Sequence, residues 1–496
     1  MTTITSTTGT ISSAGIGSGL DVNSIVTSLM AVESQPLTAL QTKATTLQTN
    51  LSAFGQVQSL VSSLQDAAKP LFDPNSFALT NTSSTDPSSV SAGTSTGAVP
   101  GIYSVAVSSL SAGQSLVSQT GQFTDGTSVV GTGSLTIRLG TWNAGNTAFT
   151  PQAGSSDITI PIGASADTLA GVRDAINAAN AGVSATIVTD ASGARLALQS
   201  SATGAANGFR ISVADADGNN SDAAGLSRLA YDPASAAAQM TLAQSAADAQ
   251  ATINGISVTS SSNTLSGVIS NITFNLSKVT AQPVTVNVTR NTDAIKSSVA
   301  AFVAAYNSLN SYLSSETHYD PTTQTAAPLQ GDSTATSIQN QLHAMLSQST
   351  GASSMFSTLS SIGVQVQKDG SLLLSDTTFN NALTNLPQLT KALSNVDATN
   401  PSNNGFGKRF NDWTSSLLGI DGTLPGKTAS IQSSITSNQK DQDAMNALLA
   451  QTKARLQAQY TALDSTMAQA NSLAAFVTQQ FYTKSTFGSS SGSSSG

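Results

Sequence analysis

One apolar stripe runs through residues 431–481 and constrains the fold more than any other feature of the chain. Its fifteen positions are separated by steps of three or four residues, so that fourteen steps cover 50 residues, about 3.57 residues per step. This spacing lies between that of a coiled coil and that of a free helix, and it predicts one long, nearly straight helix. Most positions are apolar, including Ile431, Ile435, Met445, Leu449, Leu456, Tyr460, Leu463, Met467, Val477 and Phe481.

Such a helix would be about 75 Å long at about 1.5 Å per residue, which is more than one compact domain needs. It must therefore pack along something extended, and we favour contacts between subunits over burial in the core of this chain. Three positions of the stripe carry the polar residues Asn438, Gln442 and Thr452. Polar residues at such positions weaken a permanent coiled coil but can set its register.

A second stripe lies near the amino terminus, where the polar Gln58 and Gln65 occupy two of its places. Lys69–Pro70 should end this helix, because proline disfavours helix in the residue before it. A short helix from Asp21 or Ser24 should precede it and stop before Pro36. The partner of this stripe is left open between a bundle within the chain and another subunit. Its apolar positions are Leu37, Leu40, Ala44, Leu47, Leu51, Phe54, Val61 and Ala68.

The pattern changes between about residues 73 and 290 to short β-branched runs separated by Gly, Pro and Asn-Gly pairs, as is typical of strands. Residues 167–180 differ, because Leu169, Val172 and Ile176 have helical spacing. They predict one helix against a sheet. The sheet is expected from residues 183–188, 195–198 and 210–213, and further strands from 102–107, 135–139 and 284–288.

Helical spacing returns after Asp293, around a short insert at residues 363–374 with Asp-Gly at its centre. This insert should be a hairpin.

The ends of the chain, the first fifteen residues and the tail after Lys484, are rich in Ser, Thr and Gly. We expect the first to be disordered until bound and the second to be flexible.

The order of these segments predicts an α+β multidomain protein. A helical coiled-coil stalk built from both termini would carry a helical bundle domain and two inserted β-rich domains. The terminal coiled-coil leg is expected from residues 1–36 with 430–496, and the helical bundle domain with its hairpin from residues 37–72 with 293–429. A β-rich domain is expected from residues 73–118 with 240–292. An outer β-rich domain with one helix is expected from residues 119–239.

Composition excludes several classes of function. The 496 residues are 9% charged, with a net charge of −8 and no cysteine. No basic excess is present to neutralise phosphates, so we expect neither nucleic-acid nor membrane binding, and the absence of cysteine removes disulfides and thiolate chemistry. No stretch is long and apolar enough to span a membrane. The residues before Lys43 do not resemble a secretory signal peptide, so an extracellular protein of this kind would need another export route.

Candidates for catalysis or metal binding are few, because the chain has two histidines and two glutamates. His318 lies near Glu316 and Asp320, but three alternating residues in a loop are weak evidence for a hydrolase triad. His343 is expected to be a partly buried helix residue. The aspartates of residues 215–222 are spaced as in a calcium loop, but the final glutamate is missing. We therefore expect no catalytic residue, metal or cofactor.

Five segments together point to a known family. They are GIGSGLDVNSIVTSLMAVESQPLTAL (15–40), PGIYSVAVSSLSAGQSLVS (100–118), ATINGISVTSSSNTLSGVISNITFNL (251–276), APLQGDSTATSIQNQL (327–342) and RLQAQYTALDSTMAQANSLAAFVTQQF (455–481). They resemble the flagellar filament cap family, also called flagellar hook-associated protein 2, over about residues 14–482. The third segment is similar to a short β motif shared among flagellin-related axial proteins.

The resemblance implies a secreted structural assembly factor and not an enzyme. Family members form a homo-oligomeric cap, commonly a ring of five subunits, at the tip of the growing flagellum. The cap retains exported flagellin while it folds and enters the filament. Hook-associated junction proteins and an export chaperone are further possible partners. The two stripes would be legs that bind these neighbours, and export would not involve a cleaved signal peptide.

Two alternatives remain open. A filament or hook–filament junction subunit would polymerise into long fibres, whereas a cap should stop at a closed ring. A surface adhesin or glycan-active enzyme would need acidic or aromatic residues that converge within residues 119–239. The candidates there are Asp157, Asp167, Asp174, Asp190 and Trp142.

Overall fold

The structure is a computed structural model that describes residues 19, 21–235 and 237–486. The first fifteen residues and the tail beyond residue 486, for which we expected disorder and flexibility, lie outside this range. The described chain divides into two compact units. Residues 74–295 form the β unit, and the segments up to Asp73 and from Lys296 onwards form the helical unit.

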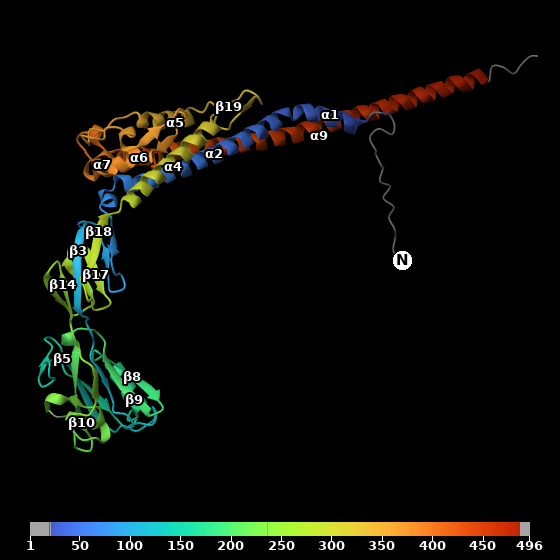
Figure 1. Ribbon diagram of the computed structural model, residues 1–496. Coiled ribbons are helices and arrows are strands. Elements are labelled where there is room, and N and C mark those ends of the chain that lie inside the picture. Colours follow the sequence, from blue (N-terminus) through green and yellow to red (C-terminus); the bar gives the residue numbers. More distant parts are fainter. Residues whose placement is uncertain (1–18, 20, 236, 487–496) are drawn as a thin grey trace, which may run out of the picture. The chain divides into compact units, whose positions relative to one another are not determined.

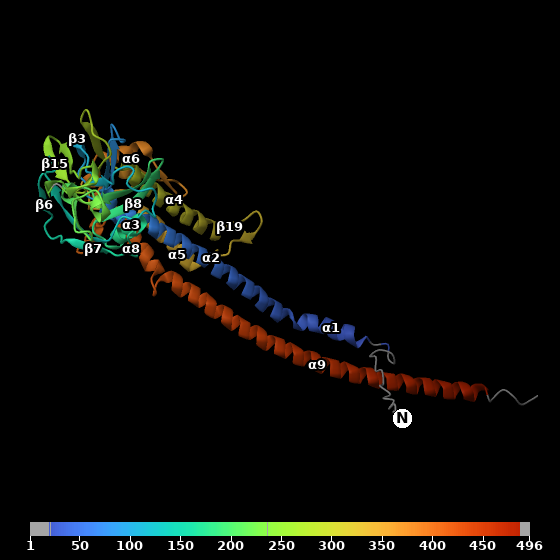
Figure 2. The same cartoon turned by 90° about the horizontal axis from the view of Figure 1, so that it is seen from below.

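The helical unit is built around two long helices. Helix α9 (Thr423–Thr486) is one continuous helix of 64 residues, which confirms the long helix expected from the stripe. It lies beside α2 and α1, which run in the opposite direction (Figures 1 and 2). The other elements are α1 (Val22–Glu33), α2 (Gln35–Phe72), α4 (Thr292–Glu316), β19 (Tyr319–Asp320), β20 (Thr325–Ala326), α5 (Ser333–Leu346), β21 (Val364–Val366), β22 (Leu372–Leu374), α6 (Asp376–Leu383), α7 (Leu386–Ser394) and α8 (Phe406–Leu418).

Helix α1 begins as the sequence predicts, because the Asp21 carboxylate accepts a hydrogen bond from the Ser24 amide at 3.0 Å. The predicted end of α2 at Lys69–Pro70 is wrong, since the helix continues through Pro70 to Phe72. Leu71, the residue after Pro70, is buried against Gly407 of α8. Burial of this side chain offsets the poor fit of a proline in the last turn of the helix.

The expected hairpin at residues 363–374 is confirmed. Strands β21 and β22 pair antiparallel, with Val364 opposite Leu374. Gly370, at the turn, has a φ of +78°, a conformation that glycine adopts without steric cost. The side-chain amide of Asn307 in α4 accepts from the Leu372 amide at 2.7 Å and donates to its carbonyl at 2.8 Å, which ties the hairpin to the bundle.

Two antiparallel sheets make up the first part of the β unit. One has the order β1, β18, β3, β14, β15, and the other has the order β16, β17, β2. Their inner faces share one core around Val90, Phe274 and Val286. The strands are β1 (Thr80–Ser84), β2 (Val90–Thr94), β3 (Gly101–Ser109), β14 (Ala249–Ile253), β15 (Ile256–Ser260), β16 (Thr264–Ile269), β17 (Ile272–Leu276) and β18 (Val284–Arg290).

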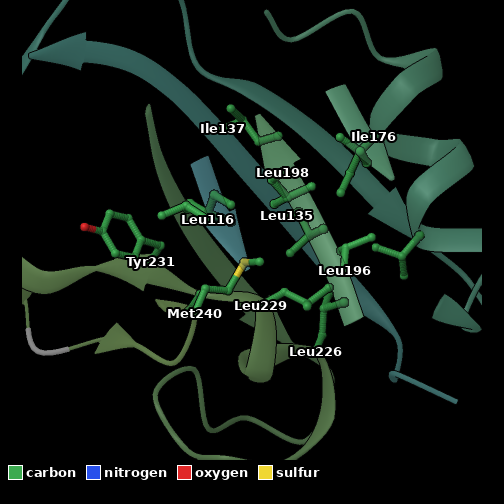
Figure 3. Packing of buried hydrophobic residues seen from close by; sticks show 14 of the residues in the cluster. Leu116, Leu135, Ile137, Ile176, Leu196, Leu198, Leu226, Leu229, Tyr231 and Met240 are labelled. Carbon is green, nitrogen blue, oxygen red and sulfur yellow. The ribbon is translucent and has the colours of Figure 1, made fainter. Parts of the chain in front are cut away.

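A second core, shown in Figure 3, lies between two further sheets and helix α3 (Leu169–Ala178), whose position the sequence predicts. One sheet has the order β13, β4, β9, β8, and the other has the order β12, β11, β10, β5, β6, with β7 also paired to β5. The strands are β4 (Ser115–Val117), β5 (Gly133–Trp142), β6 (Phe149–Pro151), β7 (Ile158–Ile162), β8 (Val183–Asp190), β9 (Gly193–Ser200), β10 (Gly208–Asp215), β11 (Tyr231–Asp232), β12 (Ala237–Ala238) and β13 (Thr241–Gln244).

The structure corrects two expectations about this part. The sheet expected from residues 183–188, 195–198 and 210–213 is wrong, because β8 and β9 pair with each other whereas β10 pairs with β5. Phe209 of β10 lies opposite Leu139, a partner 70 residues earlier, and local spacing cannot reveal such a pairing. Strands β4 and β13, which fall within the expected ranges 73–118 and 240–292, belong to the second core.

Candidate interaction surface

The first turns of α9 are fixed to two other helices. The Lys427 ammonium lies 2.6 Å from the Asp332 carboxylate and 5.3 Å from the centre of the Phe54 ring in α2. Asp332 also caps α5, because its carboxylate accepts from the amides of Thr334 and Ala335. Burial alone would raise the pKa of Asp332. Lys427 and these amides stabilise the ionised carboxylate more strongly, so the pKa lies below its ordinary value.

The middle of α9 has one covered face. Between residues 431 and 460, every position of the stripe is buried or half-buried, and every other position is exposed. Six of the predicted contact residues lie on this face, where α2 and α1 pack: Ile431, Ile435, Met445, Leu449, Leu456 and Tyr460. The register expected from the sequence is therefore the register of this helix contact. Between Ile431 and Tyr460, however, the covering helices belong to the same chain, whereas we had favoured another subunit.

The stripe of α2 is present but follows a different path after Phe54. Phe54 is fully buried, and the stripe then passes through Val57 and Leu64, which are also inaccessible to solvent. With Val57 and Leu64, the spacing of three and four residues continues from Phe54 to Ala68. The same spacing in the sequence could therefore have identified them in place of Gln58 and Gln65. The earlier predicted contact residues are half-buried: Leu37, Leu40, Leu47 and Leu51.

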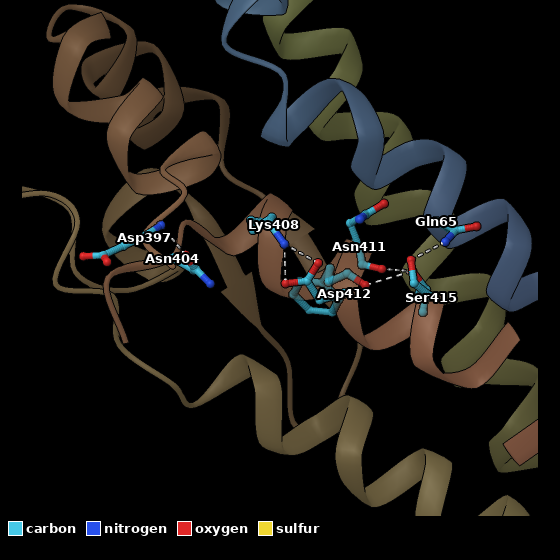
Figure 4. Close-up of polar contacts among 9 residues, drawn as sticks. Gln65, Asp397, Asn404, Lys408, Asn411, Asp412 and Ser415 are labelled. Carbon is cyan, nitrogen blue, oxygen red and sulfur yellow. Dashed lines mark hydrogen bonds and ion pairs between the residues drawn. The ribbon is translucent and has the colours of Figure 1, made fainter. Parts of the chain in front are cut away.

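Gln65 faces helix α8 and not α9. Its side-chain amide donates to the Ser415 hydroxyl at 2.7 Å (Figure 4). Earlier on α8, Asp412, one turn before Ser415, forms an ion pair with Lys408. The carboxy-terminal half of α2 is thus enclosed by bundle helices, whereas its amino-terminal half contacts α1 and α9.

The last part of α9 is uncovered. The final turns of the helix extend past α1 (Figure 2). Among the described side chains beyond Tyr460, the half-buried positions are Asp464 and Ala468, whereas the predicted contact residues Leu463, Met467, Val477 and Phe481 are exposed. Leu473 and Phe476 add to the same exposed segment, although sequence reasoning did not include them because they lie outside the stripe. The exposed fractions of these six side chains range from 38% to 69%.

Two of the residues considered for catalysis, Asp320 and His343, have structural partners. Asp320 accepts from the Thr322 amide and the Thr323 hydroxyl, both at 2.8 Å, in the turn between β19 and β20, and these hydrogen bonds lower its pKa. His343 is half-buried on α5, as predicted, and its Nε2 lies 2.6 Å from the side-chain oxygen of Asn310.

The acidic loop at residues 215–222 is also tied into its own fold. The Asp215 carboxylate accepts from the amide and the hydroxyl of Ser227, at 2.8 and 3.1 Å. Across residues 19, 21–235 and 237–486, no group of three or more His, Asp or Glu side chains could hold a metal ion. No helix within these same residues is long and apolar enough to cross a membrane.

The acidic and aromatic candidates of residues 119–239 do not form a common site. Asp157 pairs with Arg138, Asp174 with its neighbour Arg173, and Asp190 with Arg195. The Trp142 indole donates to the Phe209 carbonyl at 3.1 Å, and the backbone carbonyl of Asp167 accepts from the Val130 amide at 2.7 Å. Each is engaged with a different partner.

Comparisons with known proteins agree over most of the chain. Family models of the flagellar hook-associated protein 2 N-terminus and C-terminus match residues 18–114 and 246–472. A model of the flagellin hook IN motif matches residues 143–202. This motif therefore covers strands of the second core together with α3, whereas residues 251–276, which we likened to such a shared motif, fall within the C-terminal model.

Individual relatives cover nearly the whole length. Flagellar hook-associated protein 2 of Escherichia coli K12 is 33% identical over 95% of this chain and 98% of its own. The B-type protein of Pseudomonas aeruginosa PAO1 is 30% identical over 90% of this chain and 92% of its own.

A solved structure supports the same assignment. The D1-D2-D3 domains of the flagellar cap protein FliD from Escherichia coli superpose with a TM-score of 0.60 at 31% identity, over 77% of this chain and 99% of that one. This match confirms the expected α+β multidomain fold. The chain belongs to the flagellar hook-associated protein 2 family, a family of structural proteins that cap the flagellum.

Proposed function

We propose that this protein caps the distal end of the flagellar filament as a homo-oligomer, for which we expect a ring of five subunits. There it retains exported flagellin, promotes its folding and polymerisation, and so permits the filament to elongate. Its partners would be further copies of itself and flagellin, with junction proteins and an export chaperone as additional candidates. The protein would act outside the cell, at the flagellum.

The observation that carries this proposal is the set of exposed apolar side chains in the last part of α9, which we call the α9 tip. It comprises Leu463, Met467, Val477 and Phe481 of the stripe and, outside it, Leu473 and Phe476. Full burial of one large apolar side chain contributes about 1.5–3 kcal/mol. A contiguous set of six such residues on one helix is therefore a strong attachment point for neighbouring molecules. Between residues 461 and 482 the sequence has a single charged residue, Asp464, so little charge opposes close packing.

The test is deletion of the gene followed by complementation. The deletion strain should make short filaments and lose flagellin to the medium, and the wild-type gene should restore full length. The double variant Phe476→Asp/Phe481→Asp should fold normally, because both side chains are exposed, and yet fail to restore the filament. Gln469→Asp, an exposed polar position on the same helix, is the matched control and should restore it.

Electron microscopy and the amount of flagellin in the medium provide the readout. Full-length filaments in the deletion strain would disprove the cap function, and restoration by the double variant would disprove the role of the α9 tip. The purified protein should form a closed oligomer. Long fibres would support a filament or junction subunit instead.

A further inference from the structure

The covered face of α9 contains one residue that is unfavourable in a stable helix pair. Asn438 is only 2% exposed. Its side-chain oxygen accepts from the Gln442 amide at 2.6 Å, one turn further along the same helix. Within the described structure, its side-chain nitrogen has no hydrogen-bond partner. Buried polar groups are normally paired, and an unpaired one raises the free energy of the closed helix contact.

The packing of the two long helices changes near the same residue. On the bundle side, Leu424 and Ile431 of α9 are buried, and Asn438 is the last buried position in the described part of this helix. Further along, the covered face is only half-buried as far as Tyr460. In α2, the buried positions begin at Ala53, whose carbonyl accepts a hydrogen bond from Tyr312 of α4.

These observations divide the paired helices into two parts. The base comprises residues 53–72 of α2 and 423–437 of α9, which pack against other bundle helices or are held by Lys427. The outer arm comprises residues 22–52 of α1 and α2 and residues 439–460 of α9. In the outer arm most covered positions are half-buried, with Val22 and Val26 of α1 the buried ones. Segments with few buried contacts open at lower free energy than a core.

We propose that the outer arm opens and closes as one unit while the base stays folded, and that Asn438 sets the free energy of this opening. Opening exposes the apolar positions that the closed arm covers, such as Leu40, Leu47, Met445 and Leu449. The arm therefore controls when these residues are accessible to another helix. This conformational switch is a property of the isolated chain and does not depend on the proposed cap function.

Hydrogen–deuterium exchange of the full chain, read peptide by peptide, tests the proposal. In the wild type, residues 22–52 and 439–460 should exchange together and at least tenfold faster than residues 53–72 and 424–437. Asn438→Leu should slow exchange of the outer arm at least tenfold, equivalent to about 1.4 kcal/mol, and leave the base unchanged. Asn446→Leu is the matched control, since Asn446 is exposed on the same helix, and it should not slow the arm.

A reverse variant separates this mechanism from a general effect on helix stability. Leu449→Asn replaces a half-buried apolar side chain of the arm with an amide and should speed exchange of the arm at least tenfold without affecting the base. Equal exchange of arm and base in the wild type would overturn the proposal. So would an Asn438→Leu variant whose arm exchanges as fast as the wild type, or a uniform change over both parts.

Discussion

Replacing Lys427 with methionine should loosen the attachment of α9 to the helical bundle. Methionine retains an unbranched apolar side chain but removes the charge that lies 2.6 Å from the Asp332 carboxylate and over the Phe54 ring. The Lys427 and Asp332 side chains are only 26% and 17% exposed. The substitution therefore leaves a poorly solvated carboxylate without its counter-charge.

The expected loss of stability lies between two limits. Removing one partner from a fully buried ion pair costs about 3–5 kcal/mol, whereas exposed pairs contribute about 0.2–1 kcal/mol. Asp332 retains its hydrogen bonds from the amides of Thr334 and Ala335. We therefore expect a loss of about 2 kcal/mol, intermediate between these limits, and an unfolding temperature lower by about 4 °C.

The pH dependence gives a second, independent readout. Because the pKa of Asp332 is lowered in the folded protein, the ionised carboxylate contributes stability above its unfolded pKa. That contribution is lost as the pH falls through the lowered folded value. The difference between wild type and Lys427→Met should therefore be full at pH 7 and shrink below about pH 4, the region of an unperturbed aspartate.

Circular dichroism melts of the full chain at pH 7 and pH 3 measure both effects, and a double-mutant cycle with Asp332→Asn isolates the pair. Lys69→Met is the control, because the Lys69–Asp66 pair is exposed, and it should change the melt by less than about 0.5 kcal/mol. A coupling energy below about 0.5 kcal/mol at pH 7, or a difference between the two proteins that is unchanged at pH 3, would refute the reasoning.

Three further substitutions test local packing. Asn177→Ala should cost about 1–3 kcal/mol, because the Asn177 amide pairs with both the N–H and the carbonyl of buried Ala185 on edge strand β8; urea unfolding measures the loss, and an unchanged midpoint would contradict it. Gly407→Ala should cost about 1–3 kcal/mol, because its new Cβ would lie 2.6 Å from the Leu71 backbone. Gly426→Ala, in open space on α9, should stabilise the helix by about 0.5–1 kcal/mol; thermal melts of both variants should therefore shift in opposite directions.

The sequence predicts the covered face of α9 well for a physical reason. A helix packed on one side buries about one residue per turn, so spacing alone identifies the contact residues between Ile431 and Tyr460. It does not reveal where coverage ends. Leu456 and Leu463 occupy equivalent positions of the stripe, yet the first is half-buried and the second exposed. Beyond Tyr460 the half-buried positions in the described part of α9 are Asp464 and Ala468, so the covered face moves off the stripe by one residue.

The wrong predictions for α2 and β10 concern contacts that the pattern of a single helix or strand does not show. Helix α2 is enclosed by bundle helices beyond Ala53, and its stripe there runs through the buried Val57 and Leu64, which the choice of Gln58 and Gln65 missed. The same enclosure extends the helix through Pro70. The sheet containing β10 was missed because its partner β5 is distant in sequence, and strand spacing gives the face of a residue but not its partner.

The scarcity of charge in α9 limits how its tip can recognise a partner. Exposed ion pairs contribute little to affinity, but they commonly decide which helices pair and in which orientation. With Asp464 as the single charge between residues 461 and 482, this means of discrimination is nearly absent. Selectivity must then come from the spacing of Leu463, Met467, Val477 and Phe481, which fits a helix with the same three-and-four repeat. A narrow stripe that accepts similar helices in turn would suit the neighbours that we propose, which are repeated copies of one subunit.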